Sequence, residues 1–284
     1  MSDGVRSGHQ ASSEAELISD LGRCAVELAT GAADVVRART SGEQHISSKT
    51  TSTDLVTDTD RATEDWIMAW LARRRPQDAL LGEEGPGREG TSGVRWVVDP
   101  IDGTVNFVLG IPMYAVSIAA ESGGRVVAAA VANPVTGELF RATLGGGAYA
   151  GGGGFGAGRR LTGPRDVPLA RAVIGTGFGY DPDRRARQAA VTAALLPRIA
   201  DIRRLGSAAL DICAVAAGRL DGYFEVGLNP WDHAAAVLIA REAGALAVGP
   251  NGHEPDTALA VVGGPQLMPE LTAALDELGI AQVL

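Results

Sequence analysis

Apolar residues recur along the chain at spacings that predict alternating helices and strands. Between Leu17 and Val36 they return every three or four residues, the period of an amphipathic helix, and a second such pattern runs from Arg61 to Arg74. Further helices are predicted over 184–199, 207–217 and 232–243, and short strands near 80–81, 95–98, 116–120, 126–131, 138–142, 173–175 and 223–226. The pattern predicts a mixed α and β fold.

The same pattern suggests how the chain is divided. Residues 1–13 are polar and aperiodic, which predicts a disordered N-terminus. We expect a seam around 160–170, with an N-terminal α+β subdomain over 14–165 and a C-terminal α/β subdomain over 166–284. The glycine tract from Gly145 to Gly158 predicts a flexible hairpin tip.

Composition excludes several classes of function. The chain has 284 residues, 45% apolar and 21% charged, which is typical of an ordinary globular protein. A net charge of −9 and a pI near 5.0 argue against a nucleic-acid partner and against binding to anionic membranes. No apolar stretch is long enough to span a bilayer, and the first 14 residues lack the apolar region of a signal peptide. We therefore expect a cytoplasmic protein.

Cysteine and lysine usage narrows the chemistry further. Cys24 and Cys213 lie far apart within apolar helical patterns, which favours buried free thiols over a disulfide or a zinc site. Lys49 is the single lysine, so the chain has no phosphate-binding loop that ends in Gly-Lys-Ser/Thr.

Acidic residues follow two predicted strands. Glu83 and Glu84 follow the strand near 80–81, and Asp99 and Asp102 follow the strand at 95–98, three residues apart in a turn that contains glycine. Two carboxylates about 4 Å apart repel by roughly 4 kcal/mol at an effective dielectric constant near 20, so a site that gathers several of them needs cations. The phosphoryl group is the natural substrate for such cations.

Several of the acidic residues also have a structural interpretation. Asp58 and Asp60 precede a predicted helix and could cap it, and for Asp58 we favour the cap. Asp232 also stands at a helix start, but its place after the other acidic motifs favours metal ligation. Glu84 fits a supporting or a solvated carboxylate equally well. His233 is assigned no role, because magnesium disfavours imidazole.

Four segments in order carry a family resemblance. They are Asp54–Asp60, Gly82–Glu84, Asp99–Thr104 and Trp231–Asp232, and together they resemble the inositol monophosphatase family of magnesium-dependent, lithium-sensitive sugar phosphatases over nearly the whole chain. Gly206–Asp211 and Gly177–Tyr180 are most similar to the bacterial SuhB-like branch. The resemblance implies a layered αβαβα sandwich of the inositol monophosphatase and fructose-1,6-bisphosphatase type, and a homodimer.

The resemblance also implies a set of metal ligands. For the first magnesium ion they are Glu83, Asp99 and the backbone carbonyl of Ile101; for the second they are Asp99, Asp102 and Asp232. These oxygen ligands suit the hard cation Mg²⁺. Lys49 is expected to tether a mobile loop over Lys49–Thr57, which could also hold a third, weaker ion, so two or three ions are expected.

The catalytic and substrate roles follow from the same resemblance. Thr104, Asp60 and Glu83 are expected to orient and deprotonate a water molecule that the metal activates. The residues expected to contact the substrate are Asp102, Gly103, Thr104, Gly206, Ser207, Ala208, Glu225 and Asp232. Among them, the helix start at Gly103 and Thr104 suits a phosphate oxygen, and the Glu225 carboxylate suits adjacent hydroxyls.

The expected function is hydrolysis of myo-inositol 1-phosphate and related small sugar or polyol phosphates. Fructose-1,6-bisphosphatase, histidinol-phosphatase and 3′-nucleotidase activities remain open, because they share the metal motifs. A different class also remains open, in which a SuhB-like protein acts as a non-catalytic partner of the transcription machinery.

Overall fold

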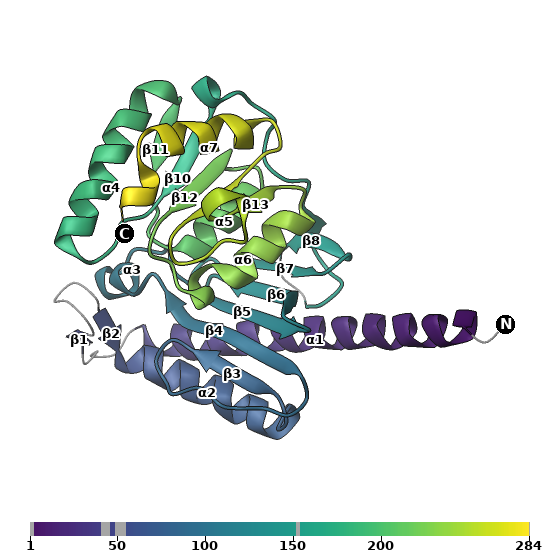
Figure 1. The fold of residues 1–284 in the computed structure, drawn as a ribbon. Helices are drawn as coiled ribbons and strands as arrows, with labels where there is room; N and C mark the ends of the chain where they lie inside the picture. Colours follow the sequence, from purple (N-terminus) through teal and green to yellow (C-terminus); the bar gives the residue numbers. More distant parts are fainter. Residues whose placement is uncertain (1–2, 41–45, 49–54, 152–153, 284) are drawn as a thin grey trace.

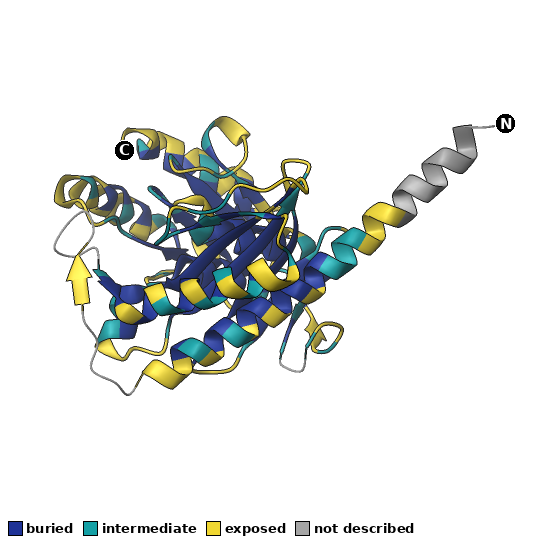
Figure 2. Ribbon diagram, turned by 90° about the horizontal axis from the view of Figure 1, so that it is seen from below, coloured by how far each residue is buried: buried dark blue, intermediate teal, exposed yellow. Residues whose placement is uncertain are grey.

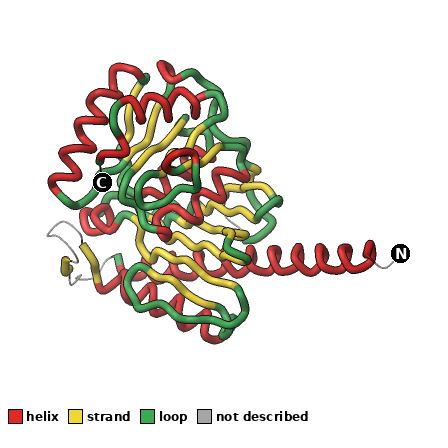
Figure 3. The backbone as a smooth tube through the Cα atoms, in the orientation of Figure 1, coloured by secondary structure: helices red, strands yellow, loops and turns green. Residues whose placement is uncertain are grey.

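The computed structural model describes residues 3–40, 46–48, 55–151 and 154–283, with residues 3–12 described by their backbone alone. The two larger β-sheets and three layers of helices alternate in the order αβαβα (Figure 1; Figure 3). The predicted layered sandwich is therefore confirmed. The three hydrophobic clusters of the core consist of the buried strands and the helix faces turned toward them, and exposed residues lie on the outer faces of the helices (Figure 2).

The first sheet has seven strands in sequence order, with β3 parallel to β4 and every other neighbouring pair antiparallel. Its strands are β3 (Ala79–Gly82), β4 (Val94–Asp102), β5 (Ala115–Ser122), β6 (Arg125–Ala132), β7 (Leu139–Thr143), β8 (Gly147–Ala150) and β9 (Arg159–Arg160). Helices α1 (Asp3–Arg39) and α2 (Asp58–Arg74) cover its outer face. The short helix α3 (Thr104–Leu109) follows β4, and β1 (Ile46–Ser48) pairs with β2 (Leu55–Thr57).

The second sheet has five strands in the order β11-β10-β12-β14-β13. Its strands are β10 (Val173–Thr176), β11 (Asp201–Arg203), β12 (Gly222–Glu225), β13 (Leu246–Val248) and β14 (Ala260–Gly263). Helices α5 (Ala208–Ala216) and α6 (Pro230–Glu242) lie between the two sheets, and α4 (Pro182–Leu195) and α7 (Leu267–Glu277) cover the outer face of the second sheet. Short 3₁₀ turns occur at Leu169–Arg171, Leu196–Arg198, Pro250–Gly252 and Ile280–Gln282.

Alternation along β4 divides its side chains between the two cores. Trp96 and Val98 are buried against α1 and α2, whereas Val97 is buried among residues of α5 and α6. A strand buried on both faces reads as a continuous apolar run, as the sequence does here. Asp99 continues the inner face that Val97 occupies, because successive side chains alternate.

Two predicted segments differ from the structure. Helix α1 begins at Asp3, with residues 3–12 described by their backbone alone, and the disorder predicted for residues 1–13 stays a prediction. The glycine tract contains β8, whose Ala148 and Ala150 are buried against β7. The helix predicted to reach residue 199 ends at Leu195, close to Pro197, which has no N–H to donate.

Other elements were not predicted at all. Strands β11, β13 and β14 have only three or four residues, too few for a periodic signal, and α7 was also missed. The first sheet ends at Arg160 and the second begins at Val173, yet α5 and α6 from the C-terminal half pack on the first sheet. Division into subdomains at residue 165 therefore stays a prediction. None of the helices that the structure describes combines the length and apolar composition needed to cross a bilayer.

Candidate active site

The loop after β3 carries Glu83 and is held by a buried carboxylate from α2. Glu64 accepts hydrogen bonds from the N–H groups of Glu84 and Gly85, both at 2.8 Å. A Cβ at Gly82 or at Gly85 would lie within 2.6 Å of Glu64 Oε1, so a side chain at either position would displace this hydrogen-bonded carboxylate. Glu64 thereby places Glu83 at the end of β3, beside the end of the parallel strand β4.

A β-bulge at the end of β4 brings Asp99 and Asp102 to the same site. In the register with β5, Asp99 pairs with Ser117 and Asp102 pairs with Ala115, so β4 has one extra residue. Residues three apart on a regular strand point to opposite faces, and the extra residue removes that offset. The N–H of Ile101 donates to Asp99 Oδ1 at 2.9 Å inside this bulge.

Asp232 reaches the same place from the start of α6. Its carboxylate accepts the N–H of Asn229 at 2.6 Å, as the third residue of a capping box, and Pro230 opens the helix. Ser117 Oγ donates to the carbonyl of Trp231 at 3.1 Å, which fixes the helix start against the strand that pairs with Asp99. Asp232 therefore completes the capping box of α6 and is also a member of the acidic cluster.

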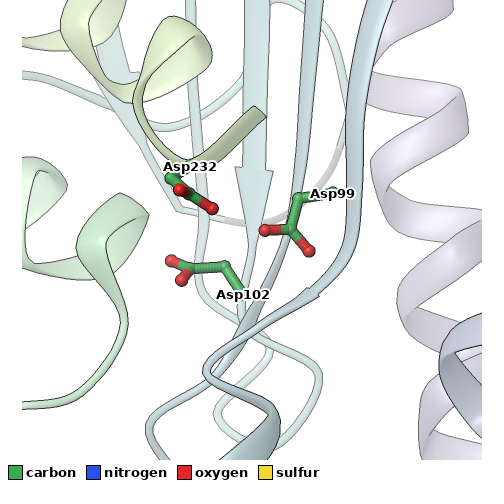
Figure 4. A group of neighbouring side chains, drawn as sticks. All are labelled: Asp99, Asp102 and Asp232. Atoms are coloured by element: carbon green, nitrogen blue, oxygen red, sulfur yellow. The ribbon is translucent and has the colours of Figure 1, made fainter. Parts of the chain in front are cut away.

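The cluster formed by Asp99, Asp102 and Asp232 is the centre of the site (Figure 4). One carboxylate oxygen from each residue lies within 4.8 Å of the others. Burial, and after it the charge of Glu83, raises the pKa of Asp99 well above its usual value, and the two carboxyl groups share a hydrogen bond. Burial and the charge of Asp102 likewise raise the pKa of Asp232. The protein thus concentrates negative charge that an added cation would stabilise.

Asp102 also accepts hydrogen bonds from the N-terminus of α5 and from the serine that precedes it. Its Oδ2 receives hydrogen bonds from Ser207 Oγ at 2.6 Å and the N–H of Ala209 at 2.7 Å, and its Oδ1 receives the N–H of Ala208 at 3.3 Å. Burial raises the pKa of Asp102 to about 6, and these donors limit the rise. Gly206, with φ of +98°, makes the turn into α5.

Thr104 and Asp60 form the predicted pair. Thr104 Oγ1 lies 3.3 Å from Asp60 Oδ1 and 3.1 Å from the carbonyl oxygen of Ile101, so its single proton is donated to one of the two. The other carboxylate oxygen of Asp60 accepts the N–H and the hydroxyl of Thr57. Burial raises the pKa of Asp60 to about 6. Asp60 therefore completes a capping box and contacts Thr104 as well, and its catalytic role stays a prediction.

A cleft of about 580 Å³ connects the cluster with the predicted substrate contacts. Of the predicted site residues, those that line the cleft are Glu83, Asp99, Ile101, Asp102, Gly103, Thr104, Gly206, Ser207, Ala208, Glu225 and Asp232. Asp60 is fully buried behind Thr104 instead. Figure 4 shows the aspartates converging from β4 and α6.

The structure adds residues to this wall that the sequence did not single out. Asp211 on α5 lines the cleft, and one of its buried oxygens has no hydrogen-bond partner. Burial, and after it the charge of Glu225, raises the pKa of Asp211 to about 8. Burial also raises the pKa of Glu225 to about 7, against the effect of a hydrogen bond from the hydroxyl of Tyr223. Glu225 was predicted as a substrate contact, whereas Asp211, in the first turn of α5, was not.

Several smaller predictions have clear outcomes. Asp58 does not cap α2, because Thr57 takes that position with its hydroxyl, and the exposed Asp58 lies 3.7 Å from Arg61. His233 is buried on the side of α6 that lines a different cavity. The two cysteines are free and buried, as predicted. Lys49 and Asp54, with the proposed third ion site, lie outside the described residues.

The donor set favours a hard divalent cation. Every side chain in the cluster offers carboxylate oxygen, and neither histidine nor cysteine belongs to it within the described part of the chain. Mg²⁺ takes a few carboxylates, keeps several waters and prefers oxygen. The residues present therefore fit the cation that the sequence predicts.

Comparisons with known proteins agree with the site. A model of the inositol monophosphatase family matches residues 18–279. The chain is 45% identical to an inositol-1-monophosphatase of Mycobacterium leprae over 92% of its own length and 96% of that protein, and 44% identical to the Nus factor SuhB of Escherichia coli over 69% of its own length and 72% of that protein. The solved structure of Mycobacterium tuberculosis SuhB superposes with a TM-score of 0.77 at 40% identity, covering 93% of this chain and 98% of that one. The predicted hydrolase class is confirmed at this level, and the chain belongs to the inositol monophosphatase family.

Proposed function

We propose that this protein is a Mg²⁺-dependent phosphomonoesterase that hydrolyses myo-inositol 1-phosphate and related small polyol or sugar phosphates. The observation that carries the proposal is the cluster of Asp99, Asp102 and Asp232, which opens into a cleft lined by neutral, acidic and basic side chains. An inositol-1-monophosphatase that is 45% identical over most of the chain supports the choice of substrate.

The metal ligands in this proposal are Glu83, Asp99, the carbonyl of Ile101, Asp102 and Asp232. Bound ions would neutralise the phosphoryl oxygens and make a water molecule acidic enough to attack phosphorus near neutral pH. The bulge in β4 and the cap of α6 hold Asp99 and Asp232 before any cation binds, so little reorganisation is needed.

In this proposal, Thr104 and Asp60 accept the proton that the attacking water molecule loses. When the attacking water loses its proton to Thr104 Oγ1, the hydroxyl proton of Thr104 passes to Asp60 Oδ1, 3.3 Å away. With its pKa raised to about 6, Asp60 is largely ionised near pH 7 and close enough to that pH to be an effective acceptor. Thr57 holds the second oxygen of Asp60 and so fixes the orientation of the carboxylate.

The substrate side of the cleft is assigned to Gly103, Gly206, Ser207, Ala208 and Glu225. A Cβ on Gly103 would lie 3.0 Å from the carbonyl oxygen of Gly206, so the absence of a side chain keeps the loops close together. Glu225 is held by Tyr223, and its carboxylate can accept hydrogen bonds from two adjacent hydroxyls. This supports a polyol as the leaving alcohol.

The test is phosphate release from a panel of inositol, fructose, histidinol and nucleoside phosphates, with MgCl₂ or with EDTA. We expect release that requires Mg²⁺, favours inositol 1-phosphate and is lost in Asp99→Asn. Asp65→Asn, at an exposed position of α2, is the matched control and should remain active. If the wild type prefers another member of the panel, that compound becomes the proposed substrate. Phosphate release by the wild type in EDTA would contradict the assignment of a metal site.

A second candidate function rests on one relative. The Escherichia coli protein named Nus factor SuhB is 44% identical over 201 residues. We therefore also propose that this chain binds a component of its transcription machinery, independently of catalysis. In a pull-down, Asp99→Asn should retain such a partner as well as the wild type does. If no partner is captured by either protein, this second function fails and the first is unaffected.

The homodimer that the family resemblance implies is a further part of the proposal. Leu109, the last residue of α3, and Ile111 are large apolar side chains exposed by 67% and 42%, which supports a surface covered by a second subunit there. Light scattering should give twice the mass of the 29.2 kDa chain, and a monomer at micromolar concentration would contradict this.

A further inference from the structure

A second cavity lies along helix α6, apart from the catalytic cleft. It has a volume of about 510 Å³. The residues that α6 contributes to it are spaced three and four apart, so they form one face of the helix; they include Pro230, His233, Val237 and Arg241. The turn between β5 and β6 and the segment 254–257 form other parts of its wall. Cavities of several hundred Å³ have the size that small molecules occupy in proteins.

His233 brings an unpaired polar group to this wall. The residue is only 8% exposed, and within the described part of the chain its Nδ1 has no hydrogen-bond partner. Buried polar atoms in proteins are normally paired, because an unpaired one loses its bonds to water and gains none in return. A hydroxyl or an amide group both donates and accepts, so it can pair with the imidazole in either tautomer. The partner that the cavity receives therefore carries such a group.

The charged side chains around the cavity already have partners within the protein. Arg95 lies 2.6 Å from Glu121, and Arg241 lies 2.7 Å from Glu254. The others are Arg125, which lies 3.7 Å from Glu14, and Glu242 and Asp256, which accept backbone N–H groups. Since each charge is paired, the cavity favours a neutral ligand.

Apolar side chains make up much of the remaining wall. They are Val126, Leu144, Pro230, Ala234, Val237, Leu238 and Pro255. Apolar surface that leaves water on binding contributes affinity in proportion to its area. The wall therefore suits a ligand whose body is apolar and whose polar group is small.

The cavity is distinct from the catalytic cleft, although the two share a wall. None of the three aspartates of the metal cluster lines it. Thr257 lines both spaces, and its carbonyl oxygen accepts the N–H of Gly227, which lines the catalytic cleft, at 2.7 Å. A molecule in the second cavity would thus contact the segment that borders the cleft without occupying the place of the substrate.

We propose that this cavity is a second binding site, which takes a small neutral molecule with an apolar body and one hydroxyl or amide group that hydrogen-bonds to His233. The inference goes beyond the proposed phosphatase function and does not depend on it, because the site contains none of the residues assigned to catalysis.

The test titrates the metal-free wild type with phenol and with toluene, two probes of similar size that differ by a hydroxyl against a methyl group. The chain has four histidines, so the ring C–H signals in an NMR spectrum are few, and the signal of His233 is the one that His233→Phe removes. We expect phenol to shift that signal with saturation. His233→Phe should weaken phenol about tenfold, which is typical of a lost hydrogen bond in a buried site, while toluene binds at least as well as before.

His253→Phe is the matched control, because His253 is exposed and does not line the cavity. It should leave both dissociation constants within twofold of the wild type. Val126→Trp, which fills the cavity from β6, should abolish the binding of both probes and gives a second variant that keeps His233.

Three outcomes would overturn the proposal. In the first, phenol at saturating concentration leaves the His233 signal of the wild type in place. In the second, phenol binds equally well to the wild type and to His233→Phe or Val126→Trp. In the third, the His233 signal shifts when the wild type alone is diluted, which would show that a second copy of the chain fills the cavity. Each outcome leaves the test of the phosphatase unaffected.

Discussion

Asparagine at position 99 would remove one negative charge from the carboxylate cluster and keep an oxygen that can accept the N–H of Ile101. The carboxylate oxygens of the three aspartates lie within 4.8 Å of one another, so at an effective dielectric constant of about 20 each ionised pair repels by about 3.5 kcal/mol. Asp99 takes part in two of the three pairs, one with Asp102 and one with Asp232. Proton uptake already relieves part of this repulsion, so Asp99→Asn should raise the free energy of unfolding of the metal-free protein by about 2 to 4 kcal/mol at pH 8.

In MgCl₂ the wild type should become more stable than Asp99→Asn, which reverses their order in EDTA. A ligand at one hundred times its dissociation constant stabilises the folded state by about 2.7 kcal/mol, and the wild type should gain roughly this amount from MgCl₂. Asp99→Asn should gain much less, because it loses a ligand shared by both proposed ions. Urea unfolding at pH 8, followed by circular dichroism in EDTA and in MgCl₂, measures all four free energies.

The control and the refutation are equally direct. Asp65→Asn removes an exposed carboxylate of α2 and should leave both the free energy of unfolding and its response to Mg²⁺ within about 0.5 kcal/mol of the wild type. An Asp99→Asn protein that is less stable than the wild type in EDTA, or that gains as much from Mg²⁺, would show that the cluster is neither repulsive nor a cation site.

Three further predictions concern Thr104, the raised pKa values in the cleft, and the ion pair of Arg165 with Asp221. Thr104→Val should lower kcat by about 100-fold or more, with the Mg²⁺-dependent stabilisation unchanged, while Thr104→Ser keeps most of the rate in a phosphate-release assay. The raised pKa values of Asp102 and Glu225, about 6 and about 7, stabilise the metal-free protein at low pH. That contribution, about 3 kcal/mol from each carboxyl group, is lost as pH rises from about 4 to about 8. A free energy of unfolding in EDTA that increases over this pH range, measured with urea, would contradict the prediction. Arg165→Ala should destabilise the protein by about 2 to 4 kcal/mol in thermal or urea unfolding, because it leaves the fully buried carboxylate of Asp221 without its cation, and a loss below 0.5 kcal/mol would show that the N–H of Val173 suffices.

Local sequence predicted the long elements well. The apolar stripe of α1, the buried run of β4 and the alternating strands β5 to β7 all lie where the pattern placed them, because each buries a continuous face. The short strands of the second sheet and the helix α7 carry too few residues, or too weak a pattern, to be identified without their neighbours. In β14, for example, four residues are buried because β12 and β13 flank them.

The candidate site was predicted mostly by resemblance, and the reasons differ between residues. Asp99 and Asp102 follow an apolar run, a signal that sequence carries. Asp211 carries no such signal, because a single acidic residue in an apolar helix is common. Its place in the site is decided by the packing of α5, whose first turn lies at the cleft.

By itself, the sequence determined the helix and strand periods, the absence of a lysine-based phosphate loop, and the order of acidic motifs that identifies the family. Tertiary structure decided which of those acids meet. Period-two alternation would separate Asp99 from Asp102, and the bulge against β5 brings them together. Asp232 joins them because α6 packs between the sheets and Ser117 fixes its start. Contacts between segments more than a hundred residues apart in the sequence depend on how the layers pack, and the local pattern of apolar residues does not determine them.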